Sequence, residues 1–263
     1  MSRHSCRRIY CVDMGNTRTH CAIVEASKDG SFACVDSADY QTSNFTDVFK
    51  GEKLLEKSGT ELLAWCSVVP SKAAELEPLL PESAMRLTCL NCPIKMESRN
   101  PAQVGQDRMA DVVGASLFFK PPYIVVDMGT AVTIDLVDAR GVYSGGVIAP
   151  GMHAFTSYLS ERAAQLPAIN PSEIDYDIIV GKDTKEAMGV GCARGFCKLA
   201  DGIIADIGEK YFSGIGIDIN SRTIFTGGSV GLLPKKWLAE RKIECNLAHL
   251  GLAKSYILNE SKK

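Results

Sequence analysis

The chain has 263 residues and a formal net charge of −2, and 46% of its residues are hydrophobic and 23% charged. These values are typical of a globular protein with one large domain or two ordinary ones, and they give no electrostatic case for a nucleic-acid partner. No apolar stretch is long enough to span a bilayer, and the first apolar run ends at Asp13, too early for a signal peptide. We therefore expect a cytoplasmic protein without nucleic-acid or membrane partners.

Hydrophobic patterning predicts an α/β protein that opens with a three-stranded β-meander. The strands of this meander are expected at residues 9–13, 19–25 and 31–37. The other elements expected before Pro121 are helices at 44–57, 72–80 and 106–119 and strands at 62–69 and 85–90. Those expected after Pro122 are strands at 123–127, 132–137, 142–147 and 223–225 and helices at 154–165, 184–212, 235–240 and 248–258.

A repeated tetrapeptide is the most informative feature of the sequence. Val12-Asp13-Met14-Gly15 recurs as Val126-Asp127-Met128-Gly129, and Thr19 and Thr133 follow the repeated aspartate at the same distance. Both copies continue through a strand into a charged turn, which indicates a duplication. We expect two similar halves that enclose a ligand-binding cleft. Their predicted bounds are 1–119 and 120–263.

Each repeated segment has the features of a phosphate-binding turn. Gly15-Asn16-Thr17 and Gly129-Thr130-Ala131 place small residues, amides and hydroxyls directly after a strand, where backbone N–H groups bind anionic oxygens. A carboxylate beside bound phosphate requires a cation, so Asp13 and Asp127 suggest Mg²⁺ or another metal. The alternative is a pair of hairpin turns in which aspartate accepts turn amides. The repeated context favours phosphate binding.

The segment Gly105-Gln106-Asp107-Arg108 opens the helix expected at 106–119. Asp107 is either a helix cap or the base that orients a substrate hydroxyl in phosphoryl transfer, and the residues alone favour neither. Arg108 adds a candidate anion clamp. The chain also has one Cys-x-x-Cys, at Cys89 and Cys92, without a second pair or suitably spaced histidines. We therefore expect ordinary thiols rather than a zinc site.

Together these segments resemble the type III pantothenate kinases, a family that includes proteins named Bvg accessory factors. The segments that carry the resemblance are 13–17, 105–108, 127–133, 145–151, 164–167, 181–184 and 226–228. The resemblance implies a duplicated actin-like (ribonuclease H-like) fold and the phosphorylation of pantothenate by ATP, the first step of coenzyme A synthesis. It also implies Mg²⁺ with the ATP, a monovalent cation (K⁺ or NH₄⁺), and a homodimer with pantothenate at the subunit interface.

The resemblance further implies roles for individual residues. Asp107 would take the proton from the pantothenate hydroxyl, and Asp127 would bind the monovalent cation. Asp13 would serve the Mg²⁺ and phosphate region. The remaining nucleotide contacts would come from Gly15, Asn16, Thr17, Thr130, Thr133, Gly227 and Gly228. Pantothenate would be held by Gly105, Arg108, Ser98 and Thr184, the last from the partner subunit.

The chain departs from the family pattern at three positions. Gln106 replaces a small residue, Ser98 falls where many members have a Tyr over the pantothenate pocket, and His20 stands where some members have a Lys.

Two other functions are alternatives to an active pantothenate kinase. A non-catalytic regulatory relative would be expected to lack at least one of the carboxylates of Asp13, Asp107 and Asp127, and all three are present. Another kinase or phosphatase of the same fold is disfavoured by the segment 105–108.

Overall fold

The computed structural model of the chain describes residues 6–262, which form two compact units. Unit 1 consists of residues 6–120, 141–144 and 246–262, and unit 2 of residues 121–140 and 145–245. The first boundary falls one residue from the division predicted at 119 and 120. Residues 246–262, which that division places in the second half, belong to unit 1.

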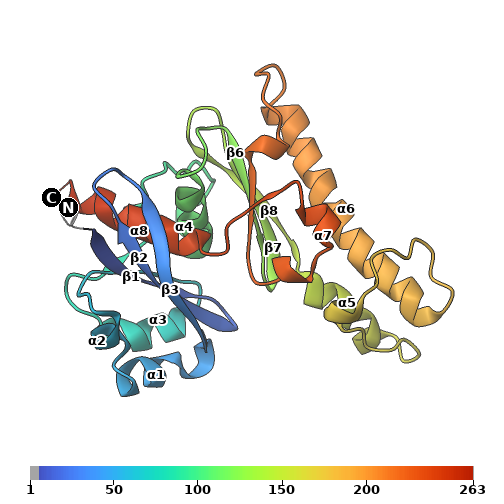
Figure 1. Cartoon of the computed structure of the whole chain (residues 1–263), viewed down its shortest axis with the longest axis horizontal. Coiled ribbons are helices and arrows are strands. Elements are labelled where there is room, and N and C mark those ends of the chain that lie inside the picture. The colour runs from blue at the N-terminus through green and yellow to red at the C-terminus, as the bar shows by residue number, and fades with distance from the viewer. Residues whose placement is uncertain (1–5, 263) are drawn as a thin grey trace, which may run out of the picture. The chain divides into compact units, whose positions relative to one another are not determined.

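Unit 1 is built on a mixed β-sheet (Figure 1). Its elements are β1 (Arg7–Met14), β2 (Arg18–Ala26), β3 (Phe32–Gln41), α1 (Phe45–Gly51), α2 (Leu54–Ser58), β4 (Leu63–Ser67), α3 (Pro70–Leu76), β5 (Met85–Arg86), α4 (Gln106–Ala115) and α8 (Leu247–Glu260). The strand order is β3-β2-β1-β4-β5. The first three strands are antiparallel neighbours, which confirms the predicted meander, and β4 runs parallel to β1.

Helices cover both faces of this sheet. Helices α1, α2 and α3 pack on one face around a core that includes Phe45, Trp65 and Leu76. Helices α4 and α8 pack on each other and contact the strands from the other face. The helix expected at 44–57 is divided into α1 and α2, because Lys53 between them has a left-handed backbone with φ of +52°. Strand β1 is therefore central and buried, apart from its two ends.

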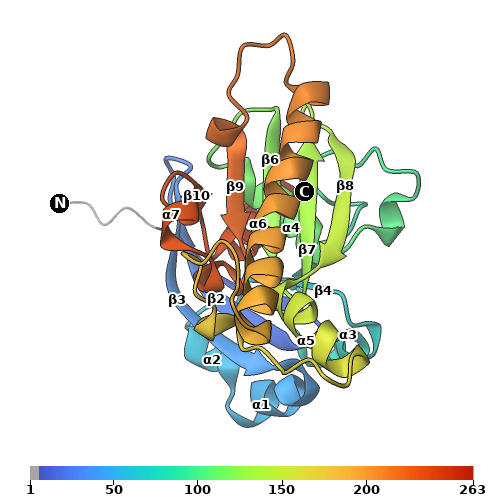
Figure 2. The same cartoon turned by 90° about the vertical axis from the view of Figure 1, so that its right-hand side faces the viewer.

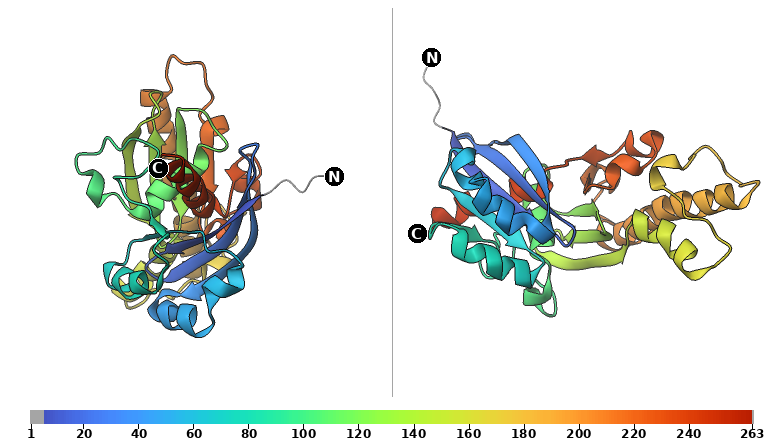
Figure 3. Two further views of the ribbon diagram at one scale, coloured as in Figure 1. Left: turned by 90° about the vertical axis from the view of Figure 1, so that its left-hand side faces the viewer. Right: turned by 90° about the horizontal axis from the view of Figure 1, so that it is seen from below.

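Unit 2 holds a second sheet with the order β10-β9-β6-β7-β8. Its elements are β6 (Tyr123–Met128), β7 (Ala131–Val137), β8 (Tyr143–Pro150), α5 (Met152–Arg162), α6 (Thr184–Tyr211), β9 (Thr223–Thr226), α7 (Lys235–Leu238) and β10 (Lys242–Ile243). Figure 2 shows α6 lying along the sheet, and Phe196 and Ile204 of this helix join the strand residues in one core. Figure 3 (right) shows α5 beside the first half of α6, where Phe155 meets Phe196 edge-on.

The two copies of the repeated tetrapeptide end equivalent central strands, β1 and β6, but their turns differ by one residue. The Gly15 N–H donates to Arg18 O, whereas the Gly129 N–H donates to Ala131 O, at 3.0 Å in both turns. In consequence Asp13 lies opposite His20, while Asp127 lies opposite Thr133. Thr19 and Thr133, equally spaced in sequence, are therefore not equivalent in the structure.

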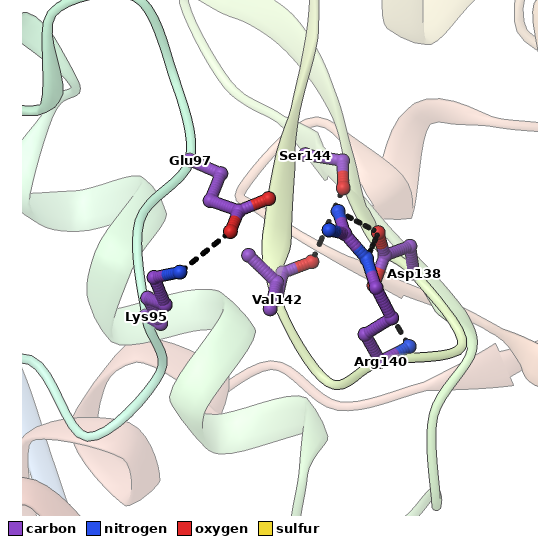
Figure 4. A network of polar contacts seen from close by, with 6 residues as sticks. All are labelled: Lys95, Glu97, Asp138, Arg140, Val142 and Ser144. Carbon is purple, nitrogen blue, oxygen red and sulfur yellow. Dashed lines mark hydrogen bonds and ion pairs between the residues drawn. The ribbon is translucent and has the colours of Figure 1, made fainter.

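The charged turns that follow the repeats are also alike. In the turn after β2, Asp29 Oδ1 accepts from the Ser31 N–H at 2.9 Å. In the turn after β7, Asp138 Oδ1 accepts from the Arg140 N–H at 2.9 Å, and Asp138 Oδ2 accepts from Arg140 Nη2 at 2.7 Å (Figure 4). Figure 4 also shows Lys95, whose Nζ lies 2.6 Å from Glu97 Oε1 within unit 1. The matching turns support the duplication.

Two further expectations from the sequence concern membranes and thiols. Within residues 6–262, none of the helices combines the length and the apolar character needed to cross a membrane. All ten cysteines are free thiols, and Cys11, Cys21 and Cys66 are buried in strands, as predicted.

Helices α4 and α8 approach so closely that two glycines are required between them. A Cβ on Gly251 of α8 would clash with the carbonyl of Ala110 in α4, and a Cβ on Gly114 would clash with the carbonyl of Leu247. By contrast, a Cβ added to Gly202 on the exposed face of α6 would meet open space. Backbone-to-backbone contact thus attaches the last helix of the chain to unit 1.

We expect Gly251→Ala to destabilise the protein by about 1–3 kcal/mol, because backbone must move to admit the methyl group. Gly202→Ala should instead stabilise it by about 0.5–1 kcal/mol, since alanine loses less conformational entropy than glycine in a helix. Thermal and urea unfolding of both variants would measure the difference. Similar midpoints for the two variants would contradict the close packing of α4 and α8.

Candidate active site

The turn after β1 accepts two hydrogen bonds from Thr42, the residue that follows β3. The Thr42 hydroxyl donates to Gly15 O at 2.8 Å, and its backbone N–H donates to Thr17 O at 3.1 Å. The tip of the turn, Asn16 to Arg18, is exposed. A fixed turn with an exposed polar tip suits the binding of an anion by backbone amides. Sequence reasoning overlooked Arg18, whose position in this turn was a signal for an anion contact.

Asp13 lies near the end of β1, directly across from Cys66 on the parallel strand β4. The Cys66 thiol donates to Asp13 Oδ1 at an Sγ–O distance of 3.2 Å. Burial raises the pKa of this thiol well above its ordinary value, and the nearby carboxylates of Asp13, Asp107 and Asp111 raise it further. Cys66 is therefore a protonated donor, and it was not identified from the sequence.

Asp107 lies in the first turn of α4, after Gly105 at the N-cap position. Its Oδ1 accepts from the Arg108 N–H at 2.7 Å. A Cβ on Gly105 would clash with this carboxylate oxygen, so the carboxylate folds back over a position that has no room for a side chain. Asp107 thus interacts with its own helix terminus while its side chain remains partly exposed. This geometry is compatible with both the cap and the base, and the base stays a prediction.

The acidic residues around Cys66 suit a metal ion that is held mainly by water and substrate phosphates rather than by side chains. Asp13 and Asp107 are partly exposed, whereas Asp111 is buried on α4. Within residues 6–262, no three His, Cys, Asp or Glu side chains are grouped to hold a metal ion. Mg²⁺ keeps several waters and is commonly bound through one or two carboxylates together with substrate phosphates. Asp13 beside a phosphate-binding turn fits this mode.

His249 on α8 is a second residue that sequence reasoning missed. Its side chain is buried, and neither ring nitrogen has a hydrogen-bond partner within the described part of the chain. Burial lowers its pKa, although the carboxylate of Asp13 acts in the opposite direction. His249 is thus an imidazole near Asp13 whose burial favours the neutral form. Its place on α8, far along the chain, gave no sequence signal.

In unit 2, Asp127 lies near the end of β6, across from Thr226 on the parallel strand β9. The chain then turns at Gly227, which has a φ of +96° and whose added Cβ would clash with Asp127 Oδ1. The Ser229 N–H donates to Met128 O at 2.8 Å and holds this turn against β6. The structure therefore brings Asp127 and Gly227 together, and only a glycine fits beside the carboxylate.

The other nucleotide-binding residues predicted in unit 2 lie at three places: Gly228 follows Gly227 after β9, Thr130 lies in the turn between β6 and β7, and Thr133 lies on β7. Thr130 is exposed in the turn after β6, and a Cβ on Gly228 would meet open space. Thr133 lies opposite Asp127, but its hydroxyl donates to Asp135 Oδ2 at 3.2 Å. Asp135 is a buried carboxylate on the same strand that sequence reasoning did not single out.

The two remaining predicted substrate residues lie in different units. In unit 1, the Ser98 Oγ is buried and has no hydrogen-bond partner within residues 6–262. In unit 2, Thr184 begins α6, whose N-terminus is capped by the Asp183 carboxylate. Thr184 lines a cavity of about 740 Å³ between α5 and α6. The other residues around this cavity are Pro150, Ala154, Phe155, Tyr158, Leu159, Leu166, Ala187, Met188, Gly191 and Cys192.

Solved structures of similar fold confirm the actin-like class. One is a putative Baf family transcriptional activator from Campylobacter jejuni, with a TM-score of 0.65, 18% identity, and coverage of 96% of this chain and 99% of that one. Another is MreB5 of Spiroplasma citri bound to ADP, with a TM-score of 0.55, 12% identity, and coverage of 97% and 98%. At these identities the likeness establishes the fold alone.

Sequence relatives are more specific. The chain is 36% identical over 171 residues to the type III pantothenate kinase of Akkermansia muciniphila, covering 65% of this chain and 67% of that protein. It is 33% identical over 226 residues to the type III pantothenate kinase of Chlorobaculum tepidum, covering 83% and 82%. The family described as type III pantothenate kinase matches residues 9–206. The resemblance predicted from the motifs is confirmed, and the chain belongs to the type III pantothenate kinase family.

Proposed function

We propose that this protein transfers the γ-phosphoryl group of ATP to pantothenate and so forms 4′-phosphopantothenate, the first step of coenzyme A synthesis. The family assignment supports this reaction. The observation that supports it most directly is that consecutive residues of β4 contact both carboxylate-bearing segments: Cys66 donates to Asp13, and the Ser67 N–H donates to Gln106, the residue before Asp107. One carboxylate lies beside a phosphate-type turn and the other at a helix start next to an arginine. Phosphoryl transfer needs these two placements.

In the proposed reaction, Asp107 accepts the proton of the pantothenate primary hydroxyl as the hydroxyl oxygen attacks the γ-phosphorus. The bond from the γ-phosphorus to the β–γ bridging oxygen breaks, and ADP leaves with that oxygen. The Arg108 guanidinium and the Gly105 backbone bind the pantothenate carboxylate and amide groups. The buried hydroxyl of Ser98, which has no hydrogen-bond partner within residues 6–262, supports a role in binding pantothenate, because buried polar groups are normally hydrogen-bonded and the substrate would supply the partner. Most of the rate enhancement in such a site comes from positioning and charge neutralisation.

We assign the nucleotide contacts to two turns, one after β1 and one after β9. The amides of Gly15, Asn16 and Thr17 hold phosphate oxygens, while Gly227 and Gly228 bring backbone close to the adenosine. Asp13 would hold the Mg²⁺ that accompanies ATP, directly or through water. A bound divalent metal supplies charge neutralisation on the phosphates.

Asp127 binds the monovalent cation, K⁺ or NH₄⁺, in unit 2. The tight glycine turn at Gly227 supports this role, because it brings backbone against the carboxylate. Thr130 and Thr133 line the nucleotide side of this turn. The hydrogen bond from Thr133 to Asp135 makes Thr133 a support of the strand as well.

We further propose a homodimer whose subunits meet through the α5–α6 face of unit 2, with Thr184 contacting pantothenate bound to the partner subunit. This face carries the apolar cavity, and Tyr158 on α5 is 60% exposed. Ala187, Gly191 and Gly195 are also exposed, and they recur every four residues along α6. Small residues at this spacing permit close approach of a second helix. A second copy of the chain is the occupant that fits.

A cytoplasmic location agrees with ten free thiols in a chain that needs no disulfide. Recovery of the activity from an extracellular or periplasmic fraction, rather than from the cytosol, would contradict this location.

The reaction is tested by ADP release with and without pantothenate, in buffers that contain Mg²⁺ and either K⁺, NH₄⁺ or neither. We expect pantothenate-dependent turnover that requires one of the two monovalent cations. Asp107→Asn should lower kcat by at least about 100-fold, as expected for loss of a general base, with nearly unchanged ATP binding. Wild-type turnover by this variant would refute the base. A wild-type protein without pantothenate-dependent turnover in any salt would favour a regulatory relative.

A matched glycine pair tests the cation and nucleotide turn. We expect Gly227→Ala to lower kcat/KM for ATP by at least about 10-fold and to raise the K⁺ concentration needed for half-maximal activity, because the methyl group displaces Asp127. Gly228→Ala, with open space around the new methyl group, should leave the K⁺ dependence unchanged. The two variants are compared by steady-state kinetics over a range of K⁺ concentrations. Equal K⁺ dependence in both would remove Asp127 from the cation site.

The dimer is tested by a charge on the α5–α6 face. Ala187→Glu places a carboxylate on an exposed apolar position, so we expect a shift from dimer to monomer in sedimentation velocity, with loss of pantothenate-dependent turnover. Lys210→Glu, on an exposed position near the C-terminal end of α6 and remote from Ala187 along the helix, is the control and should remain dimeric. A monomeric wild-type protein, or a dimeric Ala187→Glu variant, would contradict this interface.

A further inference from the structure

Gln106, the residue directly before Asp107, connects the first turn of α4 to the end of β4. Its side-chain Oε1 accepts from the backbone N–H of Ser67 at 3.0 Å and from Arg86 Nε at 3.4 Å. In the sequence Gln106 was only a departure from the small residue usual at this position. The structure gives this long side chain two partners that a small residue cannot reach.

Three consecutive residues at the end of β4 make contacts with segments of the proposed active site. The Cys66 thiol donates to Asp13 Oδ1, the Ser67 N–H donates to Gln106, and the Val68 N–H donates to Met14 O at 3.1 Å. The same few residues of one strand therefore hold the strand that carries Asp13 and the helix that carries Asp107. Without Gln106, the Ser67 N–H would lack this protein acceptor, which is costly for a partly buried backbone group.

The second donor to Gln106 is itself held in place. The Arg86 guanidinium lies over the Trp65 ring, 4.6 Å from its centroid, and its Nη1 is 3.6 Å from Glu77 Oε2. The Arg86 carbonyl accepts from Asn91 Nδ2 at 2.8 Å. A fixed guanidinium and a strand amide thus approach the Gln106 oxygen, so the oxygen has little freedom. Because Gln106 belongs to the first turn of α4, these contacts also restrict the position of that turn.

We infer that Gln106 is a positioning residue, which fixes the carboxylate of Asp107 relative to that of Asp13 through the end of β4. The inference rests on the proposed role of Asp107. Gly105 provides no side-chain cap, and Gln106 adds a side-chain contact from the first turn of α4 to the end of β4. A displacement of about 1 Å in a catalytic group can lower a rate about 100-fold.

Gln106→Met removes the acceptor while keeping an unbranched side chain of similar volume. We expect kcat to fall by about 10-fold or more and KM for ATP to change by less than about twofold, because only the base is displaced. Gln106→Glu keeps an acceptor for both donors and should recover kcat to within about threefold of wild type. Gln103→Met, on an exposed residue three positions earlier, is the matched control and should have no effect.

Hydrogen exchange provides a readout that does not depend on activity. The Ser67 amide should exchange at least about 10-fold faster in Gln106→Met than in wild type, and at a near wild-type rate in Gln106→Glu. Unchanged exchange at Ser67 in Gln106→Met would overturn the contact itself. Faster exchange with unchanged kcat would overturn the positioning role. If the wild-type protein fails to phosphorylate pantothenate, the proposed function fails, while the exchange result still decides the contact.

Discussion

The parallel pairing of a central strand with a neighbouring strand of its sheet is the constraint on which the carboxylate site of each unit depends. In unit 1 it places Asp13 of β1 beside Cys66 of β4, and in unit 2 it places Asp127 of β6 beside Thr226 of β9. Each carboxylate lies near the end of a buried strand, where polar groups reach the surface without being drawn into the core. A duplicated strand pairing thus produces two carboxylate sites from one architecture.

Much of this arrangement was predictable, because it depends on local sequence. The meander and the turns with Asp29 and Asp138 follow from apolar runs separated by strong turn residues. The motifs identified the family as well, since their order along the chain is specific. In each case neighbouring residues carry the signal, and no long-range contact is needed to read it.

The features that were missed depend on contacts between distant segments. Gly114 and Gly251 are separated by most of unit 2 in the sequence, yet their close contacts attach α8 to unit 1. The one-residue difference between the turns also escaped detection, because equal spacing of Thr19 and Thr133 suggested equal roles. Likewise, Gln106 is anomalous in sequence, and only the position of the Ser67 N–H explains what its length achieves.

The differences between the two copies give a physical reason for unequal roles. In unit 1 the parallel strand beside Asp13, β4, carries a thiol, and Cys66 donates a hydrogen bond to Asp13 Oδ1. Under the proposed function, Oδ2 is the Asp13 oxygen that would face the divalent cation. In unit 2 the equivalent position is followed by Gly227, which brings main chain rather than a side-chain donor against Asp127. Carboxylate and backbone oxygens suit a weakly hydrated monovalent cation, whereas a carboxylate with an outward-facing oxygen suits strongly hydrated Mg²⁺.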